Sequence, residues 1–138
     1  MPIQWRDQFS VGNDLIDADH QYLIEIINKA EKSLQAHNAT ELTAVFNELA
    51  HYGKLHFDRE ERLARAVAYP KAEQLHLSHD ALVESLGKFR ESVGEVWTPE
   101  ATEQFTTFLR DWLIQHVIKE DLPMKPWITK FSPRFDPR

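Results

Sequence analysis

The stretch His56-Phe57-Asp58-Arg59-Glu60 places an imidazole and a carboxylate four residues apart in a segment whose apolar residues recur at helical spacing. Four residues make about one helical turn, so both side chains point the same way. We expect His56 and Glu60 to face the protein interior, where a carboxylate beside an imidazole needs a partner. The same helical stripe carries Leu42, Val45, Phe46, Leu49, Leu63 and Val67.

Other helical segments offer partners for this pair. A histidine follows the start of the first segment, two lie in the third, and the fourth ends on a histidine with two acids. The economical interpretation is a metal site at the centre of a helical bundle. The candidate residues in these segments are His20, His76, His79, His116, Glu120 and Asp121.

Composition limits the chemistry that this site can use. The chain of 138 residues has no cysteine, so thiolate-bound zinc, iron–sulfur clusters and cysteine nucleophiles are excluded. A chain of this length forms one domain, residues 1–138, and can bury roughly 70 % of its unfolded surface. Metal donors are therefore expected to be nitrogen and oxygen atoms.

Charge and hydropathy restrict partners and location. The formal net charge is −6, which argues against nucleic acid and anionic membrane surfaces. No stretch approaches the ~20 apolar residues of a membrane span, and the N-terminus lacks a signal-peptide core. We expect a cytoplasmic protein, which the absence of cysteine also favours.

Residues 1–16 are expected to form an irregular arm anchored by Trp5 and Phe9. Asp17 or Asp19 can cap the first helix. The second helix is predicted to run from Asn38 or Thr40 to about Ala68. The third helix is expected to stop near Gly94. It carries an apolar seam on one face, formed by Leu75, His79, Leu82, Leu86, Phe89 and Val93.

Thr98-Pro99-Glu100 is a strong start signal for the fourth helix. Residues 122–138 are predicted to fold back as a short tail, because Pro123 and Pro126 break the helix and Trp127, Ile128 and Phe131 supply apolar contacts. Few glycines and short connections predict an all-α fold. We expect an antiparallel up-down-up-down four-helix bundle over about 17–121, with an N-terminal arm and a C-terminal tail.

Register identifies the ligands better than the number of histidines does. A single inward histidine is more often a hydrogen-bonded core residue than a ligand, but His20, His56, His79 and His116 each lie on the core stripe of a different helix. His37 and His51 are expected at the surface. Glu60 could instead pair with a buried cation, yet Lys54, Arg59 and Arg62 point elsewhere.

Spacing alone does not decide which acid of the fourth helix is the ligand. Glu120 is four residues after His116, whereas Asp121 is rotated from it by about 140° at ~100° per residue. Imidazole-rich ligation suits iron, with zinc, manganese or copper also possible. No Glu-x-x-His pair occurs around His56, His79 or His116, so a ferritin-like site is not indicated.

The chain resembles a hemerythrin of the single-domain bacterial kind. Trp5 and Phe9-Ser10-Val11-Gly12, with Ile16-Asp17 and His20, resemble the arm and first ligand of that family. His56-Phe57-x-x-Glu60-Glu61 resembles its second-helix motif, and Trp112-Leu113-x-x-His116-Val117-x-x-x-Asp121 resembles its fourth-helix motif.

The resemblance implies two non-haem iron ions joined by an oxo or hydroxo bridge and by the carboxylates of Glu60 and Asp121. It assigns His20 and His56 to one iron. It assigns His79, His116 and another third-helix histidine to the second. The usual partner of His79 is four residues earlier, where this chain has Leu75, so His76 is the remaining candidate.

The resemblance also implies reversible dioxygen binding, for storage, delivery or sensing, and this is the leading functional hypothesis. Trp112, Leu113 and Val117 would form the apolar pocket beside His116. The alternatives are an enzyme that acts on peroxide or nitric oxide, or a bundle whose metal serves structure or signalling.

Overall fold

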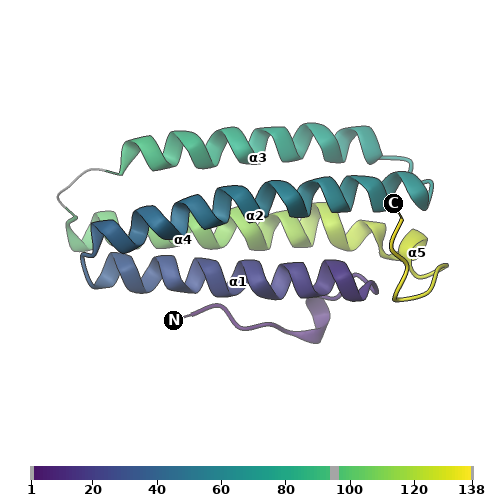
Figure 1. Ribbon diagram of the computed structural model, residues 1–138, viewed down its shortest axis with the longest axis horizontal. Helices are drawn as coiled ribbons and strands as arrows, with labels where there is room; N and C mark the ends of the chain where they lie inside the picture. Colours follow the sequence, from purple (N-terminus) through teal and green to yellow (C-terminus); the bar gives the residue numbers. More distant parts are fainter. Residues whose placement is uncertain (1, 94–96, 138) are drawn as a thin grey trace.

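The computed structural model describes residues 2–93 and 97–137. Its long helices are α1 (Asp14–Gln35), α2 (Ala39–Ala66), α3 (Ala72–Ser92) and α4 (Pro99–His116), and they run side by side along the long axis (Figure 1). Short segments complete the chain: η1 (Asp7–Phe9), η2 (Val117–Asp121), η3 (Leu122–Met124) and α5 (Lys125–Ile128). No strand occurs in 2–93 or 97–137, which confirms the predicted all-α four-helix bundle.

Two of the predicted helix starts are confirmed by their caps. The Asn38 side chain accepts a hydrogen bond from the Glu41 N–H, and the Thr98 hydroxyl accepts one from the Ala101 N–H. Each satisfies a backbone donor that the first turn of a helix leaves without a partner. The predicted stop at Gly94 lies outside the described residues.

The prediction for the first helix start was wrong. The α1 helix begins at Asp14, and the extended Asn13 caps it by accepting hydrogen bonds from the Leu15 and Ile16 N–H groups. Asp17 instead accepts from the Val11 N–H at 2.9 Å, which ties the arm to the helix. Asp19 is buried and serves the candidate site described below.

The core has two apolar clusters that lie on either side of a buried polar layer. Along α2, the larger cluster ends at Phe57 and the smaller one begins at Leu63, with Glu60 between them and His56 next to Phe57. The smaller cluster is completed by the tail residues Met124 and Ile128. Buried histidine and carboxylate side chains are thus enclosed by apolar packing.

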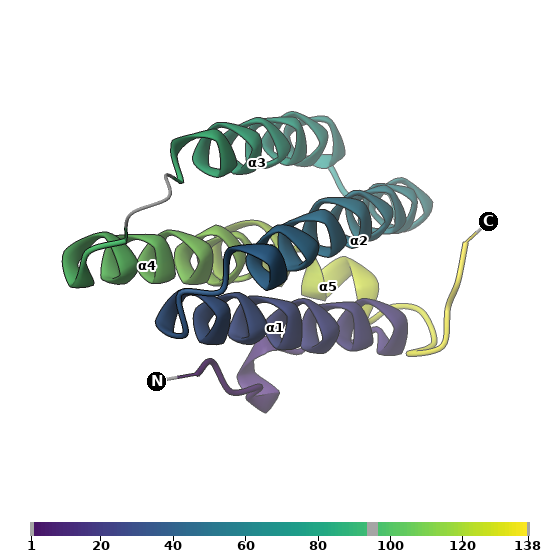
Figure 2. The ribbon, with the colours of Figure 1, turned by 60° about the vertical axis from the view of Figure 1, so that its left-hand side comes forward.

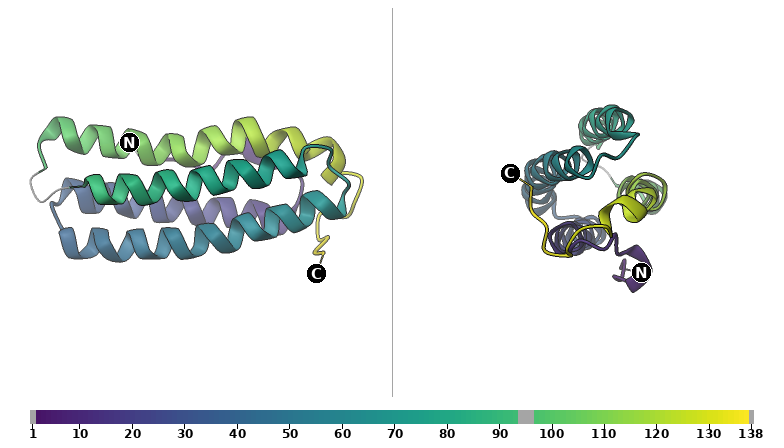
Figure 3. Two further views of the ribbon diagram at one scale, coloured as in Figure 1. Left: turned by 90° about the horizontal axis from the view of Figure 1, so that it is seen from above. Right: turned by 90° about the vertical axis from the view of Figure 1, so that its right-hand side faces the viewer.

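The helices are not packed equally closely. Viewed end on, the four helices occupy the corners of a quadrilateral, with α3 standing away from the rest (Figure 3). The α3 helix packs closely against α2, and its backbone lies further from those of α1 and α4. Within the described residues, none of the helices is long and apolar enough to cross a membrane.

The arm and the tail pack against the bundle. The arm lies along α1 (Figure 2), where the backbone of Ile3 exchanges two hydrogen bonds with the Asn28 side chain. Asn13 donates from Nδ2 to the Phe135 carbonyl at 2.9 Å, so the tail meets the start of α1. Gly12 has φ +84°, and a Cβ there would approach the Thr129 methyl group to 2.8 Å.

Candidate metal centre

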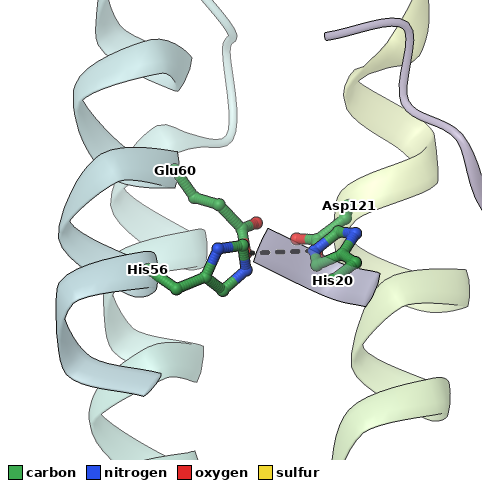
Figure 4. A group of neighbouring side chains, drawn as sticks. All are labelled: His20, His56, Glu60 and Asp121. Carbon is green, nitrogen blue, oxygen red and sulfur yellow. Dashed lines mark ion pairs between the residues drawn. The ribbon is translucent and has the colours of Figure 1, made fainter. Parts of the chain in front are cut away.

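Four buried side chains from three parts of the bundle converge at the polar layer (Figure 4). His56 and Glu60 come from α2, His20 from α1, and Asp121 from η2. His20 Nε2 lies 3.0 Å from Asp121 Oδ2 and 3.6 Å from Glu60 Oε1, and His56 Nε2 also faces Glu60 Oε1. One donor atom from each residue lies within 4.8 Å of all the others, a spacing that a single metal ion could bridge.

A second group with the same donor types adjoins the first. It consists of Glu60, Asp121, His79 and His116. His116 Nε2 lies 3.1 Å from Asp121 Oδ1 and 3.7 Å from Glu60 Oε1, and it lies 3.2 Å from His79 Nε2. Because both groups contain the two carboxylates, the arrangement offers two neighbouring metal positions, each with two imidazoles.

A π-helical turn decides which acid of the fourth helix reaches the centre. In η2 the backbone hydrogen bond runs from the Leu122 N–H to the Val117 carbonyl, five residues apart. This wider turn carries Asp121 round to the face of His116, where a regular α-helix would place Glu120. Asp121 is fully buried, whereas Glu120 is half-buried.

Two carboxylates outside the ligand groups orient the imidazoles. His56 Nδ1 donates to Asp19 at 2.9 Å, and His79 Nδ1 donates to Glu61 at 2.9 Å. In both histidines Nε2 is therefore the atom left to face the centre, as is common for metal-bound imidazoles. Sequence reasoning missed Asp19 and Glu61, although each is next to a candidate ligand in the chain.

Asp19 is a shared acceptor. Besides His56, it accepts from the Tyr52 hydroxyl at 2.6 Å and from Arg59 at 2.6 Å. Burial raises the pKa of Asp19, but hydrogen bonds from His56 and Tyr52 outweigh it and leave the pKa below its usual value. Asp19 is therefore an anion that holds the His56 ring in one orientation.

His76 lies apart from the six other predicted ligands. Its side chain is 40 % exposed, and its Nδ1 bonds to Glu61 at 2.5 Å. Leu75 occupies the core-facing position instead and is buried at 2 % exposure. Because neighbouring helical residues differ by about 100° in direction, both cannot face the centre. The structure thus brings together His20, His56, Glu60, His79, His116 and Asp121.

The donor set fits a metal ion. Several buried atoms form no hydrogen bond of good geometry within the described part of the chain: His20 Nε2, His56 Nε2, both Glu60 oxygens and both Asp121 oxygens. Buried polar atoms are normally satisfied, and buried charges are paired or coordinate metals. These atoms point into one layer, so divalent cations would satisfy them together.

The predicted pocket residues lie beside His116 on α4 and η2. Trp112, Leu113 and Val117 are all buried. The Trp112 Nε1 donates to the Leu82 carbonyl at 2.9 Å, and the Trp112 ring packs 5.8 Å from that of Phe57. This apolar packing keeps bulk water from one side of the second ligand group.

Replacing Leu75 with histidine is expected to strengthen metal binding at the second position. The new imidazole would lie one helical turn from His79 and add a third nitrogen donor. We expect metal affinity to rise by at least roughly tenfold, which is the effect of a residue that only hydrogen-bonds to a metal ligand. Metal-free protein should lose about 2 kcal/mol or more, because a polar ring replaces a buried leucine.

Metal retention against a chelator, followed over time, measures the effect. Leu77→His is the matched control, because Leu77 is on the same helix but 59 % exposed. Equal retention in the two variants would contradict the inferred position of Leu75.

Comparison with known proteins agrees with this arrangement. The family described as Hemerythrin HHE cation binding domain matches residues 11–128. A bacteriohemerythrin of Clostridium acetobutylicum is 26% identical over 121 residues, covering 85% of this chain and 94% of that protein. One from Campylobacter jejuni subsp. jejuni serotype O:23/36 is 31% identical over 119 residues, covering 81% and 84%.

Solved structures show the same fold. A crystal structure of wild-type hemerythrin aligns with a TM-score of 0.81 at 23% identity, covering 94% of this chain and 99% of that one. Because the family match spans most of the chain and includes every candidate ligand, this protein belongs to the hemerythrin family.

Proposed function

We propose that this protein binds dioxygen reversibly at a non-haem di-iron centre, for oxygen storage, delivery or sensing. The observation that carries the proposal is the pair of ligand groups that share Glu60 and Asp121 in a buried layer. Two carboxylates common to both groups suit a pair of adjacent metal ions, which an oxo or hydroxo bridge would join. The bacteriohemerythrin relatives support the same function.

The donor types favour iron. Each position is offered two imidazoles and two carboxylates, a nitrogen and oxygen set without sulfur. Bound ferrous iron supplies the electrons and the open coordination position that dioxygen requires. His20 and His56 would hold one ion and His79 and His116 the other, with Asp19 and Glu61 orienting one imidazole in each pair.

Apolar residues cover one side of the second position. Phe57 lies against the His79 ring, with centroids 4.2 Å apart and planes 12° from parallel. Trp112, Leu113 and Val117 add an apolar wall. A dry environment limits proton delivery and so slows irreversible oxidation of the centre.

Replacing Leu113 with alanine is expected to accelerate autoxidation. Leu113 is 1% exposed, and the smaller side chain would leave room for water beside His116. A roughly tenfold faster rate corresponds to about 1.4 kcal/mol of lost barrier. The rate is measured from the decay of the oxygenated visible spectrum in air.

Leu109→Ala is the matched control for this variant. Leu109 is equally buried on the same helix, one turn further from His116. Autoxidation that is unchanged in Leu113→Ala, or equally fast in both variants, would argue against the pocket.

The test of the proposed function is metal content together with the visible spectrum. Iron at both positions, with a spectrum that bleaches on reduction and returns as a distinct oxygenated form in air, is expected. A protein loaded with iron that yields no oxygenated form after reduction would refute dioxygen binding.

A second candidate function is a di-iron enzyme that reduces peroxide or nitric oxide. It is favoured by the buried Leu75, which leaves the His79 and His116 position without a further imidazole and so with more room for substrate. Catalytic turnover of peroxide with an added reductant would favour the enzyme. Stoichiometric, reversible binding of dioxygen would favour the carrier.

A further inference from the structure

An apolar hollow of about 200 Å³ lies between α2, α3 and α4, beside the candidate centre. One of its walls is formed by α3, the helix that stands away from the others in Figure 3. Its walls are almost entirely apolar, with the cations Lys54 and Arg90 as the exceptions. The residues on which the argument depends are Leu49, Gly53, Phe57, Leu86, Gly87 and Trp112.

One aromatic ring separates this hollow from the second ligand group. Phe57 lines the hollow, stacks on His79 at 4.2 Å between centroids, and lies 5.5 Å from the His116 ring. Trp112 lines the hollow as well and packs against Phe57. The Phe57 ring therefore lies between the hollow and the two imidazoles.

Two glycines line the hollow, Gly53 on its inner side and the exposed Gly87 at its edge. Gly87 sits on α3, and a Cβ built there would meet nothing within 4 Å. At Gly53 on α2, a Cβ would touch the Trp112 Cη2 atom at 3.5 Å, so the indole packs directly over the glycine. The hydrogen bond from Trp112 Nε1 to the Leu82 carbonyl links α4 to α3 across this space.

A neighbouring hollow offers a contrast in chemistry. It shares Lys54, Phe57 and Val83 with the first, and it reaches His79 directly. Because Glu61, His76 and Asp80 also line it, it suits water and protons. The apolar hollow suits a molecule without charge or hydrogen-bonding groups. Apolar cavities of this order of size stay dry and bind small apolar molecules, including xenon.

We propose that the hollow lined by Gly53, Gly87 and Trp112 is a binding site for small apolar gases and the route by which dioxygen reaches the centre past Phe57. The route rests on the proposed function, whereas the gas site does not. Binding in the hollow would raise the local concentration of the gas at a point that only the Phe57 ring separates from the candidate ligands. The route also reaches the second position without passing Glu61, His76 and Asp80 of the polar hollow.

Xenon is the probe of the site. Crystals of the protein under xenon pressure are expected to show one xenon atom in this hollow. Gly87→Leu should abolish that atom, because Gly87 lies at the exposed edge of the hollow and a leucine there would close its opening. Ala81→Leu is the matched control, since Ala81 is exposed on the same helix and lines none of the hollows described here. Wild-type crystals without xenon in the hollow would overturn the gas site.

Dioxygen kinetics of the iron-loaded protein test the route. In Gly87→Leu, association and dissociation rates are both expected to fall by about tenfold with affinity unchanged, because a blocked path slows entry and exit alike. Val83→Phe narrows the same hollow and should act in the same direction. Ala81→Leu should bind dioxygen at the wild-type rates.

The two failures can be told apart. Unchanged dioxygen rates in a Gly87→Leu protein that has lost its xenon atom would overturn the route while dioxygen binding itself stands. Iron-loaded protein that binds no dioxygen would refute the proposed function and the route with it. In that case xenon in the wild-type hollow would still support the gas site.

Discussion

Replacing Glu60 with glutamine, or Asp121 with asparagine, is expected to empty both metal positions at once. Each carboxylate belongs to both ligand groups and is fully buried. The amide is close in shape but carries no charge. The two metal ions would therefore lose one of the two carboxylate charges that they share. Removing one partner of a buried charge cluster costs roughly 3–5 kcal/mol. Metal content per chain, measured after loading and desalting, is the readout.

Glu120→Gln is the matched control for these variants. It removes the same charge one residue from Asp121, but the π-helical turn leaves Glu120 off the centre. The control is expected to bind metal like the wild type. Retention of one metal by the Glu60 or Asp121 variant would contradict a shared carboxylate, and metal loss in Glu120→Gln would contradict the role of the turn.

The metal-free protein is expected to lose stability as the pH rises from about 6.5 to about 9. Burial lowers the pKa of His20, but the carboxylates of Asp121 and Glu60 beside its ring outweigh it and raise the pKa to about 9. A histidine whose pKa is higher in the folded state stabilises the fold. That contribution is fully present below the unfolded pKa of 6.5, and it is lost as the pH rises through the folded pKa. This pKa shift corresponds to a decrease in the free energy of unfolding on the order of 3 kcal/mol across that pH range.

His116 and His79 set the shape of the same curve. Carboxylates raise the pKa of His116 well above its usual value despite burial, so His116 adds to the loss on the alkaline side. Burial lowers the pKa of His79, so His79 is neutral in both states once the pH is well above 6.5 and contributes nothing over most of this range. Metal binding requires neutral imidazoles, so metal affinity should rise over the range in which metal-free stability falls.

Urea unfolding of the metal-free protein at a series of pH values measures this dependence. His20→Gln should flatten the curve between pH 6.5 and 9, because glutamine does not titrate. Wild-type stability that is constant or increasing over this range would contradict a protonated His20 in the metal-free centre.

Helices and ligand register could be predicted from local patterns. The three- and four-residue spacing that leads from Leu42 to Val67 specifies one buried face, and His56 and Glu60 share it. Asn38 and Thr98 act within one turn of their own position, so the sequence reveals them directly. Such features depend on residues that are close in the chain.

Asn13 and Asp19 show where local patterns were insufficient. Three acids and an asparagine near the start of α1 could each cap a helix, and the tail helps to select Asn13 by accepting its amide hydrogen bond at the Phe135 carbonyl. Asp19 joins His56 and Tyr52, which are 37 and 33 residues away. Contacts between helices assigned Asp19 its role.

The sequence by itself determined the four helices, their apolar faces and the inward register of His20, His56, Glu60, His79 and His116. Spacing left Glu120 and Asp121 open, and Asp121, which the family resemblance implied, reaches the centre through a π-helical turn. Only the tertiary structure decided that Leu75 excludes His76 and that Asp19 and Glu61 orient the imidazoles. Periodicity indicates which face of a helix will be buried, because the spacing of apolar side chains is a property of each helix alone. A π-helical turn, a hydrogen bond between helices and a hollow beside a glycine depend on what another part of the chain brings to the same place.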